Sequence, residues 1–393
     1  MTEAQARVVA VVRHREHVLV CGEPGPDGDG PALPARDTAA EPAERALGHL
    51  LDDLGVAVEA VQRRGGPVPA GGVRLVPFFV DVGDRSATGG PQCPEPTWAG
   101  PAALLGAGND RWWRTYAAVA PTAETVADDM ERGSTAIAVD ALWALRDAAA
   151  RAAFEGAGLG PVVDTARSLL DARPSMAALA NRVNRAMAGA DTPAAVEAAA
   201  TDGLRRAHAA DVGAAALAAE TVDGDRVLTL SRSGTVRAAL LDARPSVVVL
   251  ASRPGGEGLA VADELADAGL DAASVPDAAV YDRLRGGDAD VVLVGADAVT
   301  PDGGVVNKVG TRAAAHAAAL AGVPCYVVCA SDKVRPAPEP DGDDGERGEF
   351  LEPLFDLTPA DLVTAVLTER GQLSADEVRE VAEEHRRLAA WDA

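Results

Sequence analysis

Polar residues that could bind an anion or move a proton follow an apolar run in the C-terminal part of the chain. Asp297 ends the run DVVLVGAD, and Asn307-Lys308-x-Gly-Thr opens the helix expected next. Backbone amides at a helix start can hold an anion. Lys308 adds positive charge, Asn307 can donate and accept hydrogen bonds, and Asp297 can act as an acid or a base. We therefore expect an anion site with proton-transfer chemistry. A turn or capping aspartate is the alternative interpretation of Asp297.

The placement of the lysines points to the same region. Only two of the 36 basic residues are lysines, Lys308 and Lys333, and both lie in one short stretch. A compact ammonium cannot be exchanged freely for a guanidinium where it must reach a phosphate or a carbonyl in a tight pocket. The pattern therefore favours a role for both lysines in ligand binding, and chance placement is the alternative.

Apolar strand-like runs alternate with helical segments from Val227 onward. Such strands predict a parallel sheet covered by helices on both faces, and ligands bind beyond the carboxyl ends of its strands. The runs are Val227–Leu230, Ser246–Ala251, Ala272–Val275, Asp290–Asp297 and Cys325–Ala330. The rule selects four residues that each come just after a strand or at its end: Ser231, Arg253, Asp297 and Lys333.

The segments before Val227 show a different order of predicted strands and helices. Residues 7–20 predict two strands around a polar turn, residues 41–54 predict a helix that ends at Gly55, and residues 73–82 predict another strand. Ala-rich helical segments then dominate: 123–154, 161–170, 176–188 and 193–221. We predict an α/β protein in three parts: a small α/β domain (1–118), a helical subdomain (119–222) and a Rossmann-like parallel-sheet domain (223–393).

The amino-acid composition limits the kinds of partner that the protein can bind and indicates its cellular compartment. The net charge of −24 over 393 residues argues against a nucleic-acid-binding surface, because phosphate contacts need clustered basic residues. Such acidity is typical of a salt-adapted, haloarchaeal-type cytoplasm. We see no bilayer-spanning run and no signal peptide, so we expect a cytoplasmic protein without membrane contact. The four cysteines lack a metal pattern and are expected to be buried thiols in a reducing cytosol: Cys21, Cys93, Cys325 and Cys329.

Several motifs occur in an order typical of one superfamily. They are Arg132-Gly133-Ser134, Arg173-Pro174-Ser175, Ser252-Arg253-Pro254, the segment Val294–Lys333 and the closing segment Phe355–Gly371. On these residues the chain, from about Val119 to Gly371, resembles the superfamily of translation initiation factor 2B alpha, beta and delta subunits. That superfamily also holds methylthioribose-1-phosphate isomerase and ribose-1,5-bisphosphate isomerase. Several ordered motifs are far more specific than a lone GAD.

The resemblance implies that the Rossmann-like domain holds a phosphorylated sugar or nucleotide, and that the chain forms a homo-oligomer, a dimer or a hexamer. It assigns substrate binding to Arg132, Gly133, Ser134, Arg173, Arg253, Asn307, Lys308 and Lys333. The isomerases use a cysteine and the aspartate of GAD. Asp297 matches that aspartate, but Ser231 occupies the cysteine position. A serine is a poorer acid or base than a thiol unless a strong base activates it, and no such base is visible nearby in the sequence.

Two functions follow from this resemblance. The first is a regulatory, initiation factor 2B-like protein that binds a phosphorylated sugar or nucleotide, since those subunits also lack the cysteine. The second is an aldose–ketose sugar-phosphate isomerase, similar to ribose-1,5-bisphosphate isomerase, that uses Asp297 with water or Ser231. No cofactor is expected for either function.

The N-terminal domain resembles Nudix domains in Trp98–Leu105 and in the position of its helical segment. A working Nudix box clusters carboxylates on one helix to hold magnesium against a pyrophosphate. Aligned on Gly55, this chain offers Asp52 and Asp53, and the Arg and the first Glu of the box are missing. We expect a degenerate site. A third function, hydrolysis of nucleoside diphosphates with magnesium, would depend on these two aspartates, for which a solvated helix face is the alternative.

Overall fold

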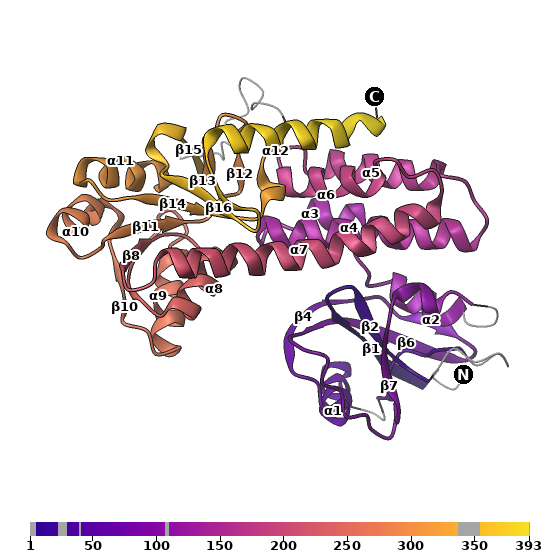
Figure 1. The fold of residues 1–393 in the computed structure, drawn as a ribbon. Coiled ribbons are helices and arrows are strands. Elements are labelled where there is room, and N and C mark those ends of the chain that lie inside the picture. Colours follow the sequence, from indigo (N-terminus) through magenta and orange to yellow (C-terminus); the bar gives the residue numbers. More distant parts are fainter. Residues whose placement is uncertain (1–4, 23–29, 39–40, 107–109, 337–353, 393) are drawn as a thin grey trace. The chain divides into compact units, whose positions relative to one another are not determined.

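The computed structural model describes residues 5–22, 30–38, 41–106, 110–336 and 354–392. Their contacts form two compact units (Figure 1). The first unit comprises residues 1–128, 140–169 and 190–205, and the second comprises 129–139, 170–189 and 206–393. Within the described ranges, no helix combines the length and the apolarity needed to cross a membrane. The three predicted domain ranges stay a prediction.

A seven-stranded mixed sheet forms the core of the first unit. Its main path runs β4-β6-β1-β2-β7, with β3 beside β1 and β5 beside β6. Strands β1 and β6 pair in parallel over nine residue pairs. The strands are β1 (Gln5–His14), β2 (His17–Cys21), β3 (Ala35–Asp37), β4 (Val58–Arg64), β5 (Val68–Ala70), β6 (Val73–Val82) and β7 (Pro96–Ala99).

Two predicted features of this unit are confirmed. Strands β1 and β2 form a hairpin in which His14 pairs with His17, and the turn residue Arg15 has a φ of 53°. Helix α1 (Ala43–Leu54) packs its leucines against the sheet. It ends at Gly55, whose φ of 63° is the left-handed conformation that glycine adopts at little cost.

In the described part of the chain, six α-helices follow β7 before the second sheet begins. They are α2 (Asp110–Ala117), α3 (Ala123–Asp128), α4 (Ser134–Phe154), α5 (Gly160–Ala172), α6 (Ala177–Met187) and α7 (Pro193–Thr221). The prediction of one helix over 123–154 was wrong. The Asp129 carboxylate accepts hydrogen bonds from the backbone amides of Glu131 and Arg132, and this side-chain-to-backbone bonding replaces helical bonds at the break.

A buried ion network joins β1 and β6 to α4 within the first unit. Arg13 donates to both carboxylate oxygens of Asp81, at 2.6 and 2.9 Å, and to Asp140 at 2.6 Å. Its guanidinium lies 4.7 Å from the ring centre of Phe79 and 5.2 Å from that of Trp143. The carboxylates of Asp140 and Asp81 raise the pKa of Arg13 against the opposing effect of burial, so the guanidinium stays charged.

The second unit contains the expected parallel sheet. Its order is β10-β9-β8-β11-β14-β16-β17, and only the β16–β17 pair is antiparallel. Apolar clusters fill both faces: Leu228, Val292 and Val327 belong to one, and Val227 and Val291 to the other. The strands are β8 (Arg226–Thr229), β9 (Ser246–Leu250), β10 (Ala272–Val275), β11 (Val291–Val294), β14 (Cys325–Val328), β16 (Ala365–Thr368) and β17 (Gly371–Leu373).

The strand order contains a topological switch point. From β8 the chain adds β9 and β10 on one side and then returns to place β11, β14 and β16 on the other. Loops after β8 and β11 therefore leave the sheet in opposite directions, and the carboxyl ends between them are the expected ligand position. The helices beside the sheet are α8 (Gly234–Ala243), α9 (Glu257–Asp267), α10 (Val280–Gly286), α11 (Thr311–Ala321) and α12 (Ala375–Leu388).

A small antiparallel sheet beside this edge was not predicted. It has the order β12-β13-β15 and consists of Ala298–Val299, Val305–Lys308 and Phe355–Thr358. Its strands are too short for a period-two pattern to stand out in the sequence. The sheet carries Asn307 and Lys308 on β13.

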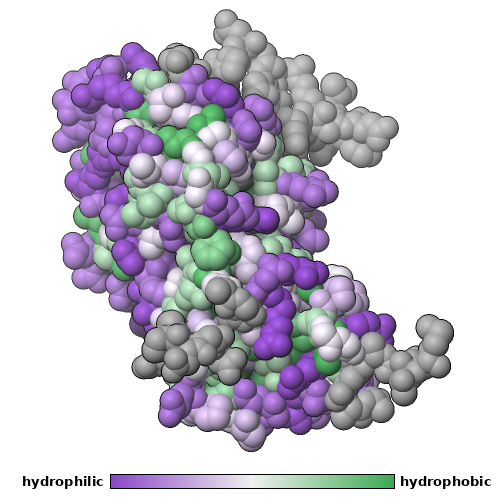
Figure 2. Space-filling model, turned by 90° about the vertical axis from the view of Figure 1, so that its right-hand side faces the viewer, coloured by the Kyte–Doolittle hydropathy of each residue, from purple (hydrophilic) through white to green (hydrophobic). Residues whose placement is uncertain are grey.

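Hydrophilic residues cover much of the face drawn in Figure 2, with apolar residues among them.

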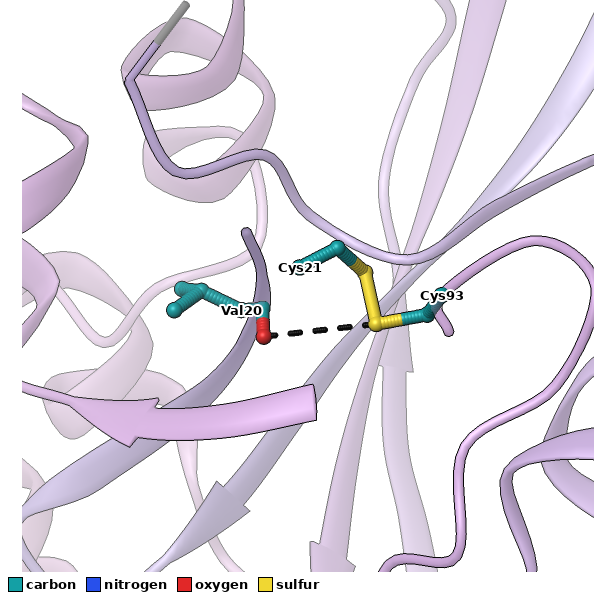
Figure 3. The surroundings of a disulfide bond; sticks show 3 residues. All are labelled: Val20, Cys21 and Cys93. Carbon is teal, nitrogen blue, oxygen red and sulfur yellow. Dashed lines mark hydrogen bonds between the residues drawn. A yellow bond between two sulfur atoms is a disulfide. The ribbon is translucent and has the colours of Figure 1, made fainter. Parts of the chain in front are cut away.

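The prediction of buried thiols is confirmed for two of the four cysteines and wrong for the other two. Cys325 and Cys329 are buried thiols, and burial raises the pKa of each to about 12. Cys21 and Cys93 instead form a disulfide (Figure 3). The expectation of thiols was wrong for this pair, because sequence does not reveal that β2 and a loop 72 residues later meet.

Candidate functional site

Loops after β8 and β11 approach closely at the switch point. Gly295 follows β11, and a Cβ added there would lie 2.7 Å from Ser233 Oγ in the loop after β8. Ser233 is fixed because its side chain caps α8 by accepting from the backbone amide of Val236. The glycine of the GAD motif thus lets the two strand-end loops come together.

Asp297 lies beside two other predicted site residues. Ser134 Oγ, at the start of α4, donates to Asp297 Oδ1 at 3.1 Å. Lys333 Nζ donates to the carbonyl of Ala296 at 2.6 Å, next to the Asp297 peptide. The Asp297 amide donates to the carbonyl of Val306, in β13. Three segments far apart in sequence therefore meet around this aspartate, as the strand-end rule anticipates.

Asn307 and Lys308 have different surroundings although they are neighbours in the chain. Asn307 is buried and its amide donates to Thr311 Oγ1 at 2.9 Å. Lys308 points to α9, where its Nζ lies 2.9 Å from Glu257 Oε1. Asn307 thus orders the turn into α11, and Lys308 carries the charge that a ligand could meet.

Ser231 contacts a carboxylate that the sequence did not reveal. It has a φ of 64°, its amide donates to Ser252 Oγ at 2.7 Å, and its Oγ donates to Glu257 Oε1 at 3.4 Å. No base is visible near Ser231 in the sequence, but the structure places the Glu257 carboxylate beside it. The only sequence signal was that Glu257 follows the Gly255-Gly256 turn at the start of a helix.

Arg253 lines a depression of about 370 Å³ at the carboxyl ends of β9 and β10. Its side chain is exposed. Its backbone amide and that of Ser252 donate to the carboxylate of Asp277 at 3.0 and 2.7 Å. Leu259 also lines the depression. The fold therefore holds the Arg253 backbone rigidly and leaves its guanidinium at the surface.

Arg132 and Arg173, both predicted to bind phosphate, converge on Asp129. Arg132 Nε lies 2.5 Å from the Asp129 carboxylate, and Arg173 Nη2 donates to the Asp129 carbonyl. Burial would raise the pKa of Asp129, but hydrogen bonds from Arg132 lower it below its ordinary value. Gly133 lies between this pair and Ser134, and a Cβ there would meet nothing within 4 Å.

The start of α11 departs from the expected anion site. The amides of Gly310 and Arg312 donate to the carboxylate of Asp356, at distances from 2.8 to 3.2 Å. Burial raises the pKa of Asp356, against the lowering effect of these two bonds. The amides that we expected to hold an anion therefore already donate to a carboxylate of the chain itself, that of Asp356. Sequence could not show this because Asp356 lies on β15, about 45 residues along the chain.

Buried charges beside Lys333 were also missed. Arg182 Nε, on α6, lies 3.1 Å from Asp332 Oδ2. Burial would raise the pKa of Asp332, but Arg182 and Arg185 lower it. Asp211 on α7 has a raised pKa, chiefly because it is buried. Polar residues in Ala-rich helices give no signal of burial, so only the tertiary structure reveals this group.

The two aspartates of the Nudix-like helix are not equivalent. Asp52 is exposed, whereas Asp53 Oδ2 lies 2.6 Å from Arg36 Nη1. In the part of the chain that the structure describes, no three His, Cys, Asp or Glu side chains are placed to hold a metal ion. The Asp53 carboxylate thus already has a cationic partner within its own unit.

Comparisons with known proteins match a long segment of the chain that includes most of the second unit. Residues 130–375 match the model of the Initiation factor 2 subunit family. A translation initiation factor eIF-2B subunit 2-like protein of Pyrococcus furiosus is 32% identical over 53% of this chain and 80% of its own length. The ribose 1,5-bisphosphate isomerase of Haloferax volcanii is 32% identical over 67% and 91%.

A solved structure is similar as well. The Pyrococcus horikoshii OT3 translation initiation factor eIF-2B has a TM-score of 0.55 and 29% identity, over 64% of this chain and 94% of its own. Translation-factor and isomerase relatives both fit at the family level. Because the family model matches more than half of the chain, the protein belongs to the initiation factor 2 subunit family.

Proposed function

We propose that this chain is a regulatory, initiation factor 2B-like protein that binds a phosphorylated sugar or nucleotide at the switch point. The supporting observation is the meeting of Ser134, Asp297 and Lys333 beyond the carboxyl ends of β11 and β14. Ammonium groups and hydroxyls suit a phosphorylated polyol, since each can donate to phosphate or sugar oxygens.

Ligand contacts divide into two groups in this proposal. Lys308 and Lys333 supply charge at the strand ends, with Asn307 and Arg253 beside them. Arg132, Gly133, Ser134 and Arg173 form a phosphate loop at the start of α4. The cations in that loop already have partners, so a phosphate competes with the Asp129 carboxylate and carbonyl.

We propose the cellular environment and the oligomeric state of the protein from its composition and from the family that it resembles. A net charge of −24 repels nucleic acid and favours a small ligand met in a salt-rich cytoplasm. A homo-oligomer, either a dimer or a hexamer, is part of the proposal. Light scattering of the full chain at high salt would measure its mass.

Isothermal titration at high salt tests the binding. The probes are ribose 5-phosphate, ribose 1,5-bisphosphate, methylthioribose 1-phosphate and nucleoside monophosphates. We expect saturable binding of at least one probe to the full chain. Arg226→Gln provides a matched control, because Arg226 lies at the opposite end of β8 and pairs with Asp290 at the surface. Absence of heat with every probe would refute the proposal.

A second candidate function is aldose–ketose isomerisation. Its support is the similarity to the Haloferax volcanii isomerase, of which the chain covers 91%, together with Asp297 at the strand end. Conversion of ribose 1,5-bisphosphate to its ketose by the wild type would establish it.

Nudix hydrolysis at Asp52 and Asp53 is the third candidate. The Arg36–Asp53 pair weakens it, since magnesium would have to compete with a guanidinium 2.6 Å from Asp53. Phosphate release from nucleoside diphosphates with magnesium, abolished in Asp52→Ala/Asp53→Ala, would be needed to support it.

A further inference from the structure

Glu257 lies between Ser231 and Lys308. One carboxylate oxygen, Oε1, lies 3.4 Å from Ser231 Oγ and 2.9 Å from Lys308 Nζ. The Glu257 side chain is 25% exposed and that of Lys308 is 14% exposed. The carboxylate is thus held by two neighbours, yet a small molecule at the strand ends can still reach it.

The turn before α9 is shaped around this carboxylate. Gly255 has a φ of 97°, and a Cβ added there would lie 2.6 Å from Glu257 Oε2 and 3.4 Å from Lys308 Nζ. Gly258 packs so tightly that its Cβ would meet the Leu250 carbonyl at 1.9 Å. Both glycines therefore allow the first turn of α9 to pack against the end of β9 and to direct Glu257 toward the site.

A carboxylate is a far better proton acceptor than a serine hydroxyl near neutral pH. Its oxygens can accept a proton directly, whereas a serine needs a neighbouring base before it can react. Positioned carboxylates commonly take protons next to a carbonyl group in isomerases. Glu257 therefore has the chemistry that Ser231 lacks, in the place where the chemistry is required.

We propose that Glu257 is the catalytic base of a sugar-phosphate isomerisation at this site. The inference rests on the proposed binding of a phosphorylated sugar there, and it supports the second candidate function, aldose–ketose isomerisation of the bound sugar. Lys308 holds the Glu257 carboxylate in place through the contact of 2.9 Å between its Nζ and Glu257 Oε1. Ser231 is a positioning residue, because its hydroxyl bonds to Glu257.

The isomerisation of a furanose 1-phosphate needs no reactant other than the substrate and the side chains of Glu257 and Asp297. Asp297 gives a proton to the ring oxygen as the bond between C1 and that oxygen breaks, and an electron pair of the phosphate-bearing oxygen leaves C1 as an oxocarbenium carbon. Glu257 then takes the proton from C2, which is now next to an electron-poor carbon, and the C2–H electron pair forms a C1=C2 double bond. Glu257 then returns its proton to C1, while the hydroxyl proton on O2 passes back to Asp297 as C2=O forms. The product is the 1-phosphorylated ketose.

Three variants of the full chain test this role. Glu257→Gln keeps the shape and removes the base, and Ser231→Ala removes the hydroxyl. Glu264→Gln is the matched control, because Glu264 lies on the same helix, is 31% exposed and pairs with Arg232 at the surface. Incubation with ribose 1,5-bisphosphate or methylthioribose 1-phosphate in D2O, followed by NMR, measures deuterium at C1 of the ketose and C2 of the aldose. Titration of the same samples measures binding.

We expect Glu257→Gln to slow exchange by about 100- to 10,000-fold, the usual contribution of a general base, while the substrate still binds. Ser231→Ala should lose less than about tenfold, and Glu264→Gln should match the wild type. Binding without exchange in the wild type, or wild-type exchange in Glu257→Gln, would overturn the role of Glu257 and leave the binding proposal standing. Absence of binding to the wild type would instead refute the proposed function itself.

Discussion

The carboxylate of Glu257 lies 2.9 Å from the ammonium group of Lys308, so one of the two lysines is neutralised within the fold. An anionic ligand group that approaches Lys308 therefore competes with Glu257. This relationship joins a residue that the sequence identified to one that it did not. It also means that affinity and catalysis at this site can be separated by substitution.

Substitutions of this pair should move phosphate affinity in opposite directions. Lys308→Gln removes a charge-assisted contact, and we expect binding of ribose 5-phosphate to weaken by about 10- to 100-fold. Glu257→Gln removes a repelling charge, so the same ligand should bind as tightly as in the wild type or several-fold tighter. Titration calorimetry at one fixed salt concentration measures both. Weaker binding in Glu257→Gln would contradict the competition between Glu257 and the ligand for Lys308.

Truncation of Arg13 should strongly destabilise the first unit. Arg13→Met leaves the buried carboxylate of Asp140 and the half-buried carboxylate of Asp81 without their shared cation. Loss of one partner from a buried ion network costs about 3–5 kcal/mol of unfolding free energy. Denaturant unfolding followed by Trp fluorescence measures it.

Arg7→Met is the control for Arg13. Arg7 pairs with Asp37 on the same sheet, but the two side chains are 35% and 48% exposed. We expect a change below about 1 kcal/mol for this surface pair. Equal effects of the two substitutions would contradict the distinction between buried and exposed pairs.

The attachment of α12 should weaken in acid through Glu384. Hydrogen bonds from Arg370, and then from Arg185, lower the pKa of Glu384 from 4.5 to about 2. A carboxyl group with a lowered pKa in the folded state contributes stability above its unfolded pKa, and this contribution is lost as the pH falls through the folded value. The stability difference between wild type and Glu384→Gln should thus be constant above pH 4.5 and shrink from there toward pH 2.

Unfolding midpoints at pH 7, 4 and 3 measure the contribution of Glu384. Glu383→Gln is the neighbouring control, since the Glu383 carboxylate pairs with Arg386 in an exposed i,i+3 contact at 2.9 Å. Its difference from the wild type should stay small at each pH. A Glu384→Gln difference that grows as the pH falls would show that the sign is wrong.

The Cys21–Cys93 disulfide should stabilise the first unit. It closes a loop of 72 residues, and a link of that kind contributes about 2–4 kcal/mol by restricting the unfolded chain. Under denaturing, non-reducing conditions we expect two titratable thiols, from Cys325 and Cys329. Dithiothreitol should lower the unfolding midpoint of the wild type but not of Cys21→Ser/Cys93→Ser. Four thiols before reduction would show that the bond is absent.

Much of the second unit could be predicted because its elements carry local signals. Helix α7 matches its predicted range, 193–221, and the sheet strands read as short apolar runs because helices cover both faces. Placement of Ser231, Asp297 and Lys333 at strand ends followed from the sheet rule alone. Their type and position sufficed because the carboxyl ends of neighbouring parallel strands lie at one edge.

Other features depend on contacts between distant segments and have no local signal. Glu257 lies at this site only because the glycine turn directs it at Lys308, and Asp356 accepts hydrogen bonds from the amides of α11 although it is on a strand about 45 residues away. The break at Asp129 follows from its bonding to the next residues, which an Ala-rich helical pattern hides. The structural or functional role of such polar residues can be inferred only once their partners in the structure are known.

A crystal structure of the full chain with a bound sugar phosphate tests the central claim most directly. The probe would be the tightest-binding compound in the titration panel, at high salt. We predict that it lies at the carboxyl ends of β8 and β11, with its phosphate or sugar oxygens bonded to Lys308, Lys333 or the Ser134 loop and its carbon chain beside Asp297. A ligand held elsewhere, with the environment of Lys308 and Asp297 unchanged, would contradict it.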